Sequence, residues 1–176
     1  RNNYADPRVT EINLHEDLSI EDESLIPVED VIITVTNNGY IKRMNVDHYK
    51  TQNRGGVGMS GIKVHEDDYV EHIRMTSTHD YHLFFTNKGR VYKIKGYKVP
   101  EGSRHSKGLP IVNLLEFQKD ECLASFTNVK DFEDENAYLT FITKKGIIKR
   151  TPIKEYANIR TNGINAINLR DDDELL

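Results

Sequence analysis

Three short, largely apolar runs mark the chain, and each stops at a turn that ends in glycine. The runs are VIITV (31–35), HLFF (82–85) and YLTFI (138–142), and the turns end at Gly39, Gly89 and Gly146. Their β-branched and aromatic residues are typical of strands, and no long apolar period of 3.6 residues interrupts them. A two-residue turn ending in glycine favours a hairpin, because glycine accepts the positive φ of a type I′ turn. The pattern predicts an all-β chain built from hairpins.

The hairpins recur as a repeat. The segments VTNNGYIKR (35–43), FTNKGRVYK (85–93) and ITKKGIIKR (142–150) align, each with a threonine three residues before its glycine. A second set of glycines comprises Gly58, Gly108 and Gly163. Each of them is followed eight residues later by an acidic residue. The glycine spacings are 50 and 57 in the first set, and 50 and 55 in the second. Because the spacings of the two sets of glycines change in parallel, they indicate a true internal repeat.

Strand repeats of this length predict a radial, bladed architecture. We expect a propeller-like ring of four-stranded blades, with 28–80 as the first blade, 81–137 as the second and 138–176 as an incomplete third. Residues 1–27 form an acidic connecting segment in which Ser19 and Asp22 could cap a short helix. Because the chain opens with Arg1 and ends on DDDELL, we expect an excerpt of a longer protein.

The net charge of −4 conceals an uneven distribution. Residues 1–30 carry two basic and nine acidic side chains, whereas residues 31–170 stand at +7. An acidic leader before a mildly basic body keeps nucleic acid open as a partner. The single cysteine, Cys122, excludes an internal disulfide and a cysteine-based zinc cluster, and favours a reducing, cytoplasmic setting. His72, His79 and His82 are interpreted as turn and strand residues, so no metal site is expected.

The basic residues of the repeat define a candidate binding surface. With Ile41, Val91 and Ile148 facing inward, strand alternation turns Lys42 and Lys149 outward and leaves Arg43, Lys93 and Arg150 at strand ends. Repetition around a wheel would arrange these cations along one rim, where a duplex could bend without any base being read. Further cations lie at hairpin tips and in loops: Lys88, Arg90, Lys144, Lys145, Arg104, Lys107 and Arg160. The alternative is that they only keep the sheet edges soluble.

No catalytic motif is present in the sequence. It has no P-loop, no HExxH, no GxSxG and no Cys–His pairing. No apolar run approaches the roughly 18 residues of a membrane span. Binding, rather than catalysis, is therefore the function predicted for this chain.

Four stretches resemble one known family throughout. They are YADPRVTEI (4–12), TSTHDYHLFFTNKGRVYKIKGYKVP (76–100), KGLPIVNLL (107–115) and KKGIIKRTPIKEYANIRTNGINAINLRDDDEL (144–175). The chain is similar to the C-terminal DNA-wrapping domain of the A subunit of DNA gyrase, a type IIA bacterial topoisomerase. The resemblance implies a β-pinwheel, a ring of about six blades whose strands cross between neighbours. This chain would supply roughly half of it.

That family carries a motif in its first blade, the GyrA box Q-[RK]-R-G-G-[RK]-G. Its counterpart here is QNRGGVG, comprising Gln52, Asn53, Arg54, Gly55, Gly56, Val57 and Gly58. Asn53 and Val57 replace cations, which lowers the charge of the loop while the glycine frame is kept. The resemblance implies a phosphate-contacting set of Arg54, Lys42, Arg43, Lys93, Lys149 and Arg150, followed by Arg104 and Lys107.

The resemblance also implies a role in strand passage. The rim would wrap duplex DNA and present a segment to the upstream cleavage domain, which holds the catalytic tyrosine. The B subunit would drive passage within an A2B2 complex, using ATP and Mg²⁺ through other domains, and leave a negative supercoil. The nearest alternative is the A subunit of topoisomerase IV, which favours decatenation. A propeller used for protein interaction is a further one, although the chain has no tryptophan and only one Gly-Gly pair, Gly55–Gly56.

Overall fold

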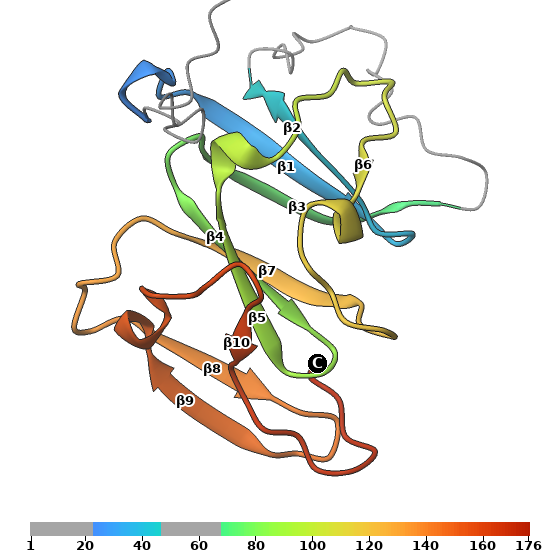
Figure 1. Ribbon diagram of the computed structural model, residues 1–176, viewed down its shortest axis with the longest axis vertical. Helices are drawn as coiled ribbons and strands as arrows, with labels where there is room; N and C mark the ends of the chain where they lie inside the picture. The colour runs from blue at the N-terminus through green and yellow to red at the C-terminus, as the bar shows by residue number, and fades with distance from the viewer. Residues whose placement is uncertain (1–22, 47–67) are drawn as a thin grey trace, which may run out of the picture.

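Three antiparallel sheets lie one below the other along the molecule in a computed structural model that describes residues 23–46 and 68–176 (Figure 1). The first sheet has the order β3-β1-β2-β6, formed by Val70–Ser77, Asp30–Thr36, Tyr40–Asn45 and Leu109–Pro110. The second has the order β10-β5-β4-β7, formed by Ile164–Asn165, Arg90–Lys95, Tyr81–Thr86 and Leu123–Val129. The third pairs β8 (Tyr138–Ile142) with β9 (Ile148–Pro152). Four short 3₁₀ helices occur among these residues: η2 (Glu23–Leu25), η4 (Gly96–Lys98), η5 (Ile111–Asn113) and η6 (Ile153–Tyr156).

The three predicted hairpins are present, but their turns are of another type. In each turn the glycine N–H donates to the threonine three residues earlier, as Gly39 does to Thr36 at 2.8 Å. Gly39, Gly89 and Gly146 have φ of 75°, 73° and 81°, and the residues before them have no positive φ. A type I′ turn needs two positive φ values. The prediction of type I′ was therefore wrong, because a type I turn followed by one left-handed glycine forms a glycine bulge instead.

The same geometry explains the repeated threonine. The hydroxyl oxygens of Thr36, Thr86 and Thr143 accept hydrogen bonds from the backbone N–H of the residue that follows each glycine, at 3.2, 3.3 and 3.1 Å. Each threonine side chain therefore satisfies a backbone donor that the bulge withdraws from the strand ladder.

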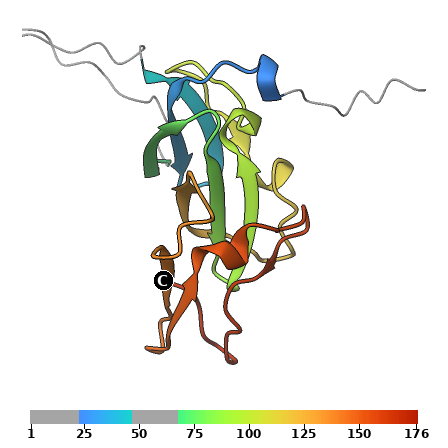
Figure 2. The same cartoon turned by 90° about the vertical axis from the view of Figure 1, so that its left-hand side faces the viewer.

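Consecutive units exchange a strand, as expected for a β-pinwheel. Strand β6 follows the second hairpin in sequence but pairs with β2 of the first, with Leu109 opposite Ile41. Strand β10 follows the third hairpin and pairs with β5 of the second, with Ile164 opposite Val91. Figure 2, seen from the side, shows the red C-terminal segment reaching up from the lowest hairpin beside the middle one. The units are therefore joined by backbone hydrogen bonds as well as by side-chain packing.

Two hydrophobic clusters fill the spaces between the sheets. One joins the first and second sheets around residues such as Ile33, Phe84 and Phe126, and the other joins the second sheet to the third around Leu83 and Phe141. The middle sheet is thus covered on both faces, which explains why β4 is almost wholly buried. Burial of this kind supplies most of the stability of such a fold.

The inward position predicted for Ile148 was wrong. Ile41 and Val91, which hold the same place in the repeat, are fully buried, whereas Ile148 is 68% exposed. The first two lie beneath the following unit and beside an exchanged strand. Among the described residues no further unit covers the sheet of β8 and β9, so Ile148 on β9 and Tyr138 and Ile142 on β8 are exposed.

Buried His82 predicts a stability that depends on pH. The ring is fully buried beside the stacked rings of Phe84 and Phe126, and neither nitrogen has a hydrogen-bond partner among the described residues. Burial lowers the pKa of His82 to about 4, and nearby Asp80 opposes this only in part. Because the folded pKa lies below the ordinary value, the unfolded chain binds the proton first, and stability is lost as pH falls from about 6.5 to about 4.

We expect His82→Gln to flatten this dependence. Urea unfolding across pH 4–7 should show a wild-type loss of up to roughly 1.4 kcal/mol per pH unit from this group, and a smaller slope in the variant. Other titrating groups contribute to both proteins and cancel in the difference. Parallel curves would show that His82 is not the group responsible.

The end of the connecting segment is attached to the second unit. Glu23 lies 2.8 Å from the Lys95 ammonium and 3.3 Å from His79 Nδ1. The Thr78 hydroxyl donates to the carbonyl of Pro27 at 2.8 Å. These contacts fix the direction from which the chain enters the sheets. The predicted cap at Ser19 and Asp22 lies outside the described residues.

Candidate nucleic-acid interface

Lys42 does not point outward as predicted. It is only 2% exposed, and its ammonium donates to the backbone carbonyls of Ser103, Arg104 and Ser106 at 3.0, 3.1 and 2.7 Å. Strand alternation does direct Lys42 to the other face of the sheet from Ile41, but the loop 99–108 covers that face. Burial lowers the pKa of Lys42. With three donors and three acceptors, this ammonium has no proton left for a phosphate.

Arg43 and Lys93 lie within strands rather than at their ends, and each reaches across to the next unit. Arg43 Nε donates to the carbonyl of Val99 at 3.2 Å, and its guanidinium lies 3.7 Å from Glu101. Lys93 Nζ donates to the carbonyl of Ala157. Both side chains are half-buried and tie neighbouring units together. Their contact with phosphate remains a prediction from sequence.

Lys149 and Arg150 occupy the corresponding places in the third unit, and Arg150 too lies within its strand rather than at the end as predicted; both are exposed. The Lys149 ammonium donates to the carbonyl of Ala166 at 2.6 Å. The Arg150 guanidinium lies 3.8 Å from the centre of the Tyr138 ring, a cation–π contact that leaves its edge toward solvent. Both can offer positive charge at the surface.

The loop 99–108, called the crossing loop below, carries the other predicted cations. It leads from η4 to β6 and runs beside β2, with Glu101 bridged to Arg43 in the strand ladder. Lys107 is exposed, and its ammonium lies 3.9 Å from the centre of the Tyr40 ring. Arg104 is half-buried on the same loop. The loop therefore brings two cations and His105 to one edge of the first sheet.

The hairpin tips are a poorer candidate for binding phosphate, because acidic residues lie beside their cations. Lys144 pairs with Glu174 at 2.6 Å, and Lys145 donates to the carbonyl of Asp171 at 2.8 Å. The Lys88 ammonium donates to a backbone carbonyl as well. An exposed ion pair of this kind is worth little to stability, but it reduces the local positive potential.

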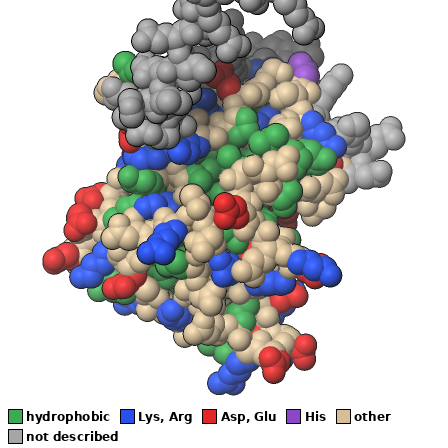
Figure 3. Space-filling model, viewed as in Figure 1, with side chains coloured by type: hydrophobic (Ala, Val, Ile, Leu, Met, Phe, Trp, Pro, Cys, Tyr) green, Lys and Arg blue, Asp and Glu red, His purple; other side chains and the backbone are tan. Residues whose placement is uncertain are grey.

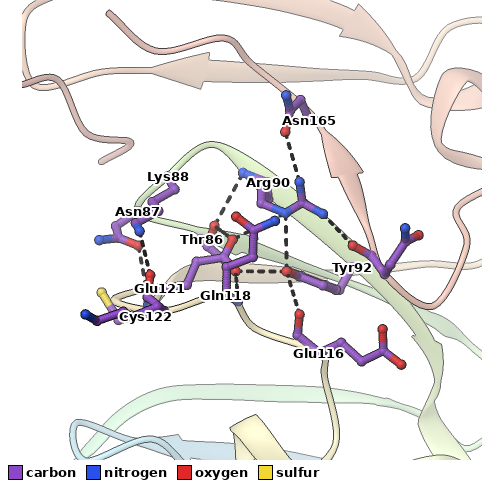
Figure 4. A network of polar contacts seen from close by, with 12 residues as sticks. Thr86, Asn87, Lys88, Arg90, Tyr92, Glu116, Gln118, Glu121, Cys122 and Asn165 are labelled. Atoms are coloured by element: carbon purple, nitrogen blue, oxygen red, sulfur yellow. Dashed lines mark hydrogen bonds and ion pairs between the residues drawn. The ribbon is translucent and has the colours of Figure 1, made fainter. Parts of the chain in front are cut away.

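Arg90 belongs to a buried network rather than to the surface (Figure 4). Its Nε lies 3.6 Å from the carboxylate of Glu121, whose side chain is fully buried. Glu121 also accepts hydrogen bonds from the Thr86 hydroxyl at 2.7 Å and the Tyr92 hydroxyl at 2.8 Å. The other end of the Arg90 guanidinium donates to Asn165 on β10. The network joins the second hairpin to the exchanged strand of the third unit.

Among the exposed cations that the sequence interpretation did not single out are Lys98 on η4 and Lys154 on η6. Both follow the second strand of a hairpin, at the start of the connection to the preceding sheet. The available signal was their similar but unequal distance from the repeat, five residues after Lys93 and four after Arg150. The box-like motif Gln52, Asn53, Arg54, Gly55, Gly56, Val57 and Gly58 lies outside the described residues, and its role stays a prediction.

Figure 3 shows Lys and Arg side chains over all three sheets on this face, with Asp and Glu side chains between them. Within 23–46 and 68–176 no group of three His, Cys, Asp or Glu residues could hold a metal ion. No helix in the same residues is long and apolar enough to cross a membrane.

Strand exchange between successive hairpins, with cations along the connections, defines a β-pinwheel of the propeller-like class. The chain belongs to the family described as "DNA gyrase C-terminal domain, beta-propeller", whose profile matches residues 30–77, 80–119 and 137–176. The resemblance inferred from sequence is confirmed.

Relatives and solved structures agree with this assignment. The DNA gyrase A protein of Streptococcus pneumoniae serotype 4 is 52% identical over 173 residues, which are 98% of this chain and 21% of that protein. Its counterpart from Staphylococcus aureus (strain COL) is 49% identical over 100% of this chain and 20% of its own length. The chain thus spans about a fifth of these relatives.

Two solved domains share the fold. The C-terminal domain of DNA topoisomerase IV has a TM-score of 0.70 and 30% identity, covering 86% of this chain and 45% of that one. A DNA gyrase A C-terminal domain has a TM-score of 0.64 and 28% identity, covering 84% and 46%.

Proposed function

We propose that the chain binds duplex DNA through its phosphates and bends it along the sheet edges that carry the crossing loop and β9. The observation that carries the proposal is the different charge environment of the two sets of cations. Lys107 and Arg150 are exposed and contact aromatic rings, and the Lys149 ammonium donates to one carbonyl, whereas the tip cations Lys144 and Lys145 contact the acidic residues Glu174 and Asp171. Sequence-independent affinity of this kind comes from counterions that the cations displace.

The wider role follows from the family. We propose that this DNA-wrapping domain acts within the A protein of a gyrase, in an A2B2 complex with the B subunit in the bacterial cytoplasm. It would present a DNA segment for ATP-dependent strand passage and negative supercoiling. ATP and Mg²⁺ would be used by other domains of the complex, and the domain itself would need no cofactor. The similarity in fold to topoisomerase IV keeps decatenation as a second candidate.

A salt series on a duplex of about 40 bp tests the binding proposal. The affinity of the chain should fall with a log–log slope near −0.9 for each neutralised phosphate. A rim variant with Arg104, Lys107, Lys149 and Arg150 changed to glutamine should lose up to about 0.9 of that slope for each contact removed. Fluorescence anisotropy of labelled DNA would measure both.

The matched control is a tip variant with Lys88, Lys144 and Lys145 changed to glutamine. Its slope should stay close to the wild-type value, since these cations interact with carboxylates and carbonyls of the chain. An equal loss in both variants would mean that DNA follows the hairpin tips instead. A wild-type slope near zero would overturn DNA binding. Supercoiling and decatenation assays on the complete enzyme would separate the two candidate activities.

A further inference from the structure

The environment of Lys42 is unusual for a buried ammonium. Its three hydrogen-bond acceptors are main-chain carbonyls of the crossing loop, and within the described part of the chain no carboxylate pairs with it. A buried charge is tolerated only when its hydrogen bonds are satisfied. The cation therefore depends on this loop for its solvation.

The backbone of the crossing loop, in turn, packs closely against the Lys42 side chain. Gly102 and Gly108 belong to it, and a Cβ on either would approach the Lys42 side chain to 3.2 or 3.3 Å. Gly108 has a φ of +92°, and a Cβ there would also lie 2.5 Å from the carbonyl oxygen of Ile41. Only glycine fits this backbone without strain. The loop closes over the aliphatic stem and presents its carbonyls to the ammonium.

This arrangement governs where the loop cations lie. Three carbonyls between Ser103 and Ser106 turn toward Lys42, so the intervening backbone is fixed from beneath. Arg104 is part of that segment, and Lys107 follows it directly.

We propose that Lys42 is a positioning residue for DNA binding: it holds the crossing loop in the conformation that presents Arg104 and Lys107 to phosphates, without contacting DNA itself. The inference rests on the proposed function. It assigns to the repeated Lys–Arg pair of the first unit an internal role, where the sequence pattern favoured a surface one.

The test compares four forms of the chain in the salt series: wild type, Lys42→Met, the loop variant Arg104→Gln/Lys107→Gln, and the combination of all three changes. Methionine keeps the length and apolar character of the stem and removes the ammonium. Lys42→Met should lower the salt slope by about as much as the loop variant, up to roughly two contacts at 0.9 each. The combined variant should lower it no further, because the residues act through one loop.

Two further measurements separate positioning from a general loss of structure. Hydrogen exchange should rise at amides of residues 102–108 in Lys42→Met while the amides of β4 and β5 stay protected. Lys130→Met, which removes one exposed charge far along the sequence from the loop, should leave the slope unchanged.

Each outcome is decisive. Non-additive slopes with local exchange in the loop support the proposal. If Lys42→Met leaves the slope unchanged, or adds its full effect to that of the loop variant, the positioning role is overturned while DNA binding stands. If the wild-type chain shows no salt-dependent binding, the proposed function fails, and this inference fails with it.

Discussion

Replacing Glu121 with alanine is expected to lower the free energy of unfolding by about 3–5 kcal/mol. The carboxylate is fully buried and accepts hydrogen bonds from the Thr86 hydroxyl, the Tyr92 hydroxyl and the Gln118 N–H, at 2.7, 2.8 and 2.6 Å. Its loss leaves the Thr86 hydroxyl and the Gln118 N–H without this acceptor, leaves the Tyr92 hydroxyl only the Glu116 carbonyl, and removes the charge that balances Arg90. Removing one member of a buried pair is costly because the other stays buried without compensation.

Urea denaturation measures the effect, and Glu116→Ala is the matched control. The Glu116 side chain is exposed, and Tyr92 uses only its backbone carbonyl, which alanine retains. The control should stay within about 0.5 kcal/mol of wild type. Glu121→Gln, which preserves shape without charge, should fall between the two. Equal stabilities for the Glu116 and Glu121 alanine variants would show that the network contributes little.

Replacing Gly89 with alanine is expected to destabilise the chain by roughly 2–5 kcal/mol, through two separate causes. Its φ of +73° costs an L-residue about 1–2 kcal/mol. A Cβ would also lie 2.5 Å from the carbonyl oxygen of Ile167 and 2.9 Å from its Cγ2. The backbone of Gly89 accepts hydrogen bonds from Ala166 and Ile167, so the exchanged segment cannot move away freely. Overpacking of this kind adds about 1–3 kcal/mol.

Comparison with Gly146→Ala separates the two causes. Gly146 holds the same place in the repeat with a φ of +81°, but nothing lies within 4 Å of a Cβ built on it. Alanine there should cost only the backbone term, about 1–2 kcal/mol. The difference between the two variants, measured by urea unfolding, reports the close seating of the exchanged segment on Gly89. Equal costs would mean that this segment yields without penalty.

The candidate interface was predicted only in part. The repeat identified which cations occur regularly, and Lys149, Arg150 and Lys107 are indeed exposed. Strand alternation could not reveal that Lys42 is covered by a loop 61 residues away, or that Arg43 and Lys93 bind carbonyls of the next unit. Alternation assigns a side chain to a face of its own sheet, whereas exposure depends on what another segment places over that face.

The local sequence by itself determined the hairpins, the glycine at each turn and the threonine that caps it, since these depend on contacts between residues no more than four apart. It also indicated the family, through four stretches that resemble that family throughout. Only the tertiary structure determined the burial and the contacts of residues at equivalent positions of the repeat. Lys42, Tyr92 and Lys149 occupy the same place in three units. Lys42 is buried and binds backbone carbonyls, Tyr92 belongs to a buried hydrogen-bond network, and Lys149 is exposed. The physical reason is strand exchange: each unit is completed by a different neighbour, and the neighbour sets burial, charge and hydrogen bonding.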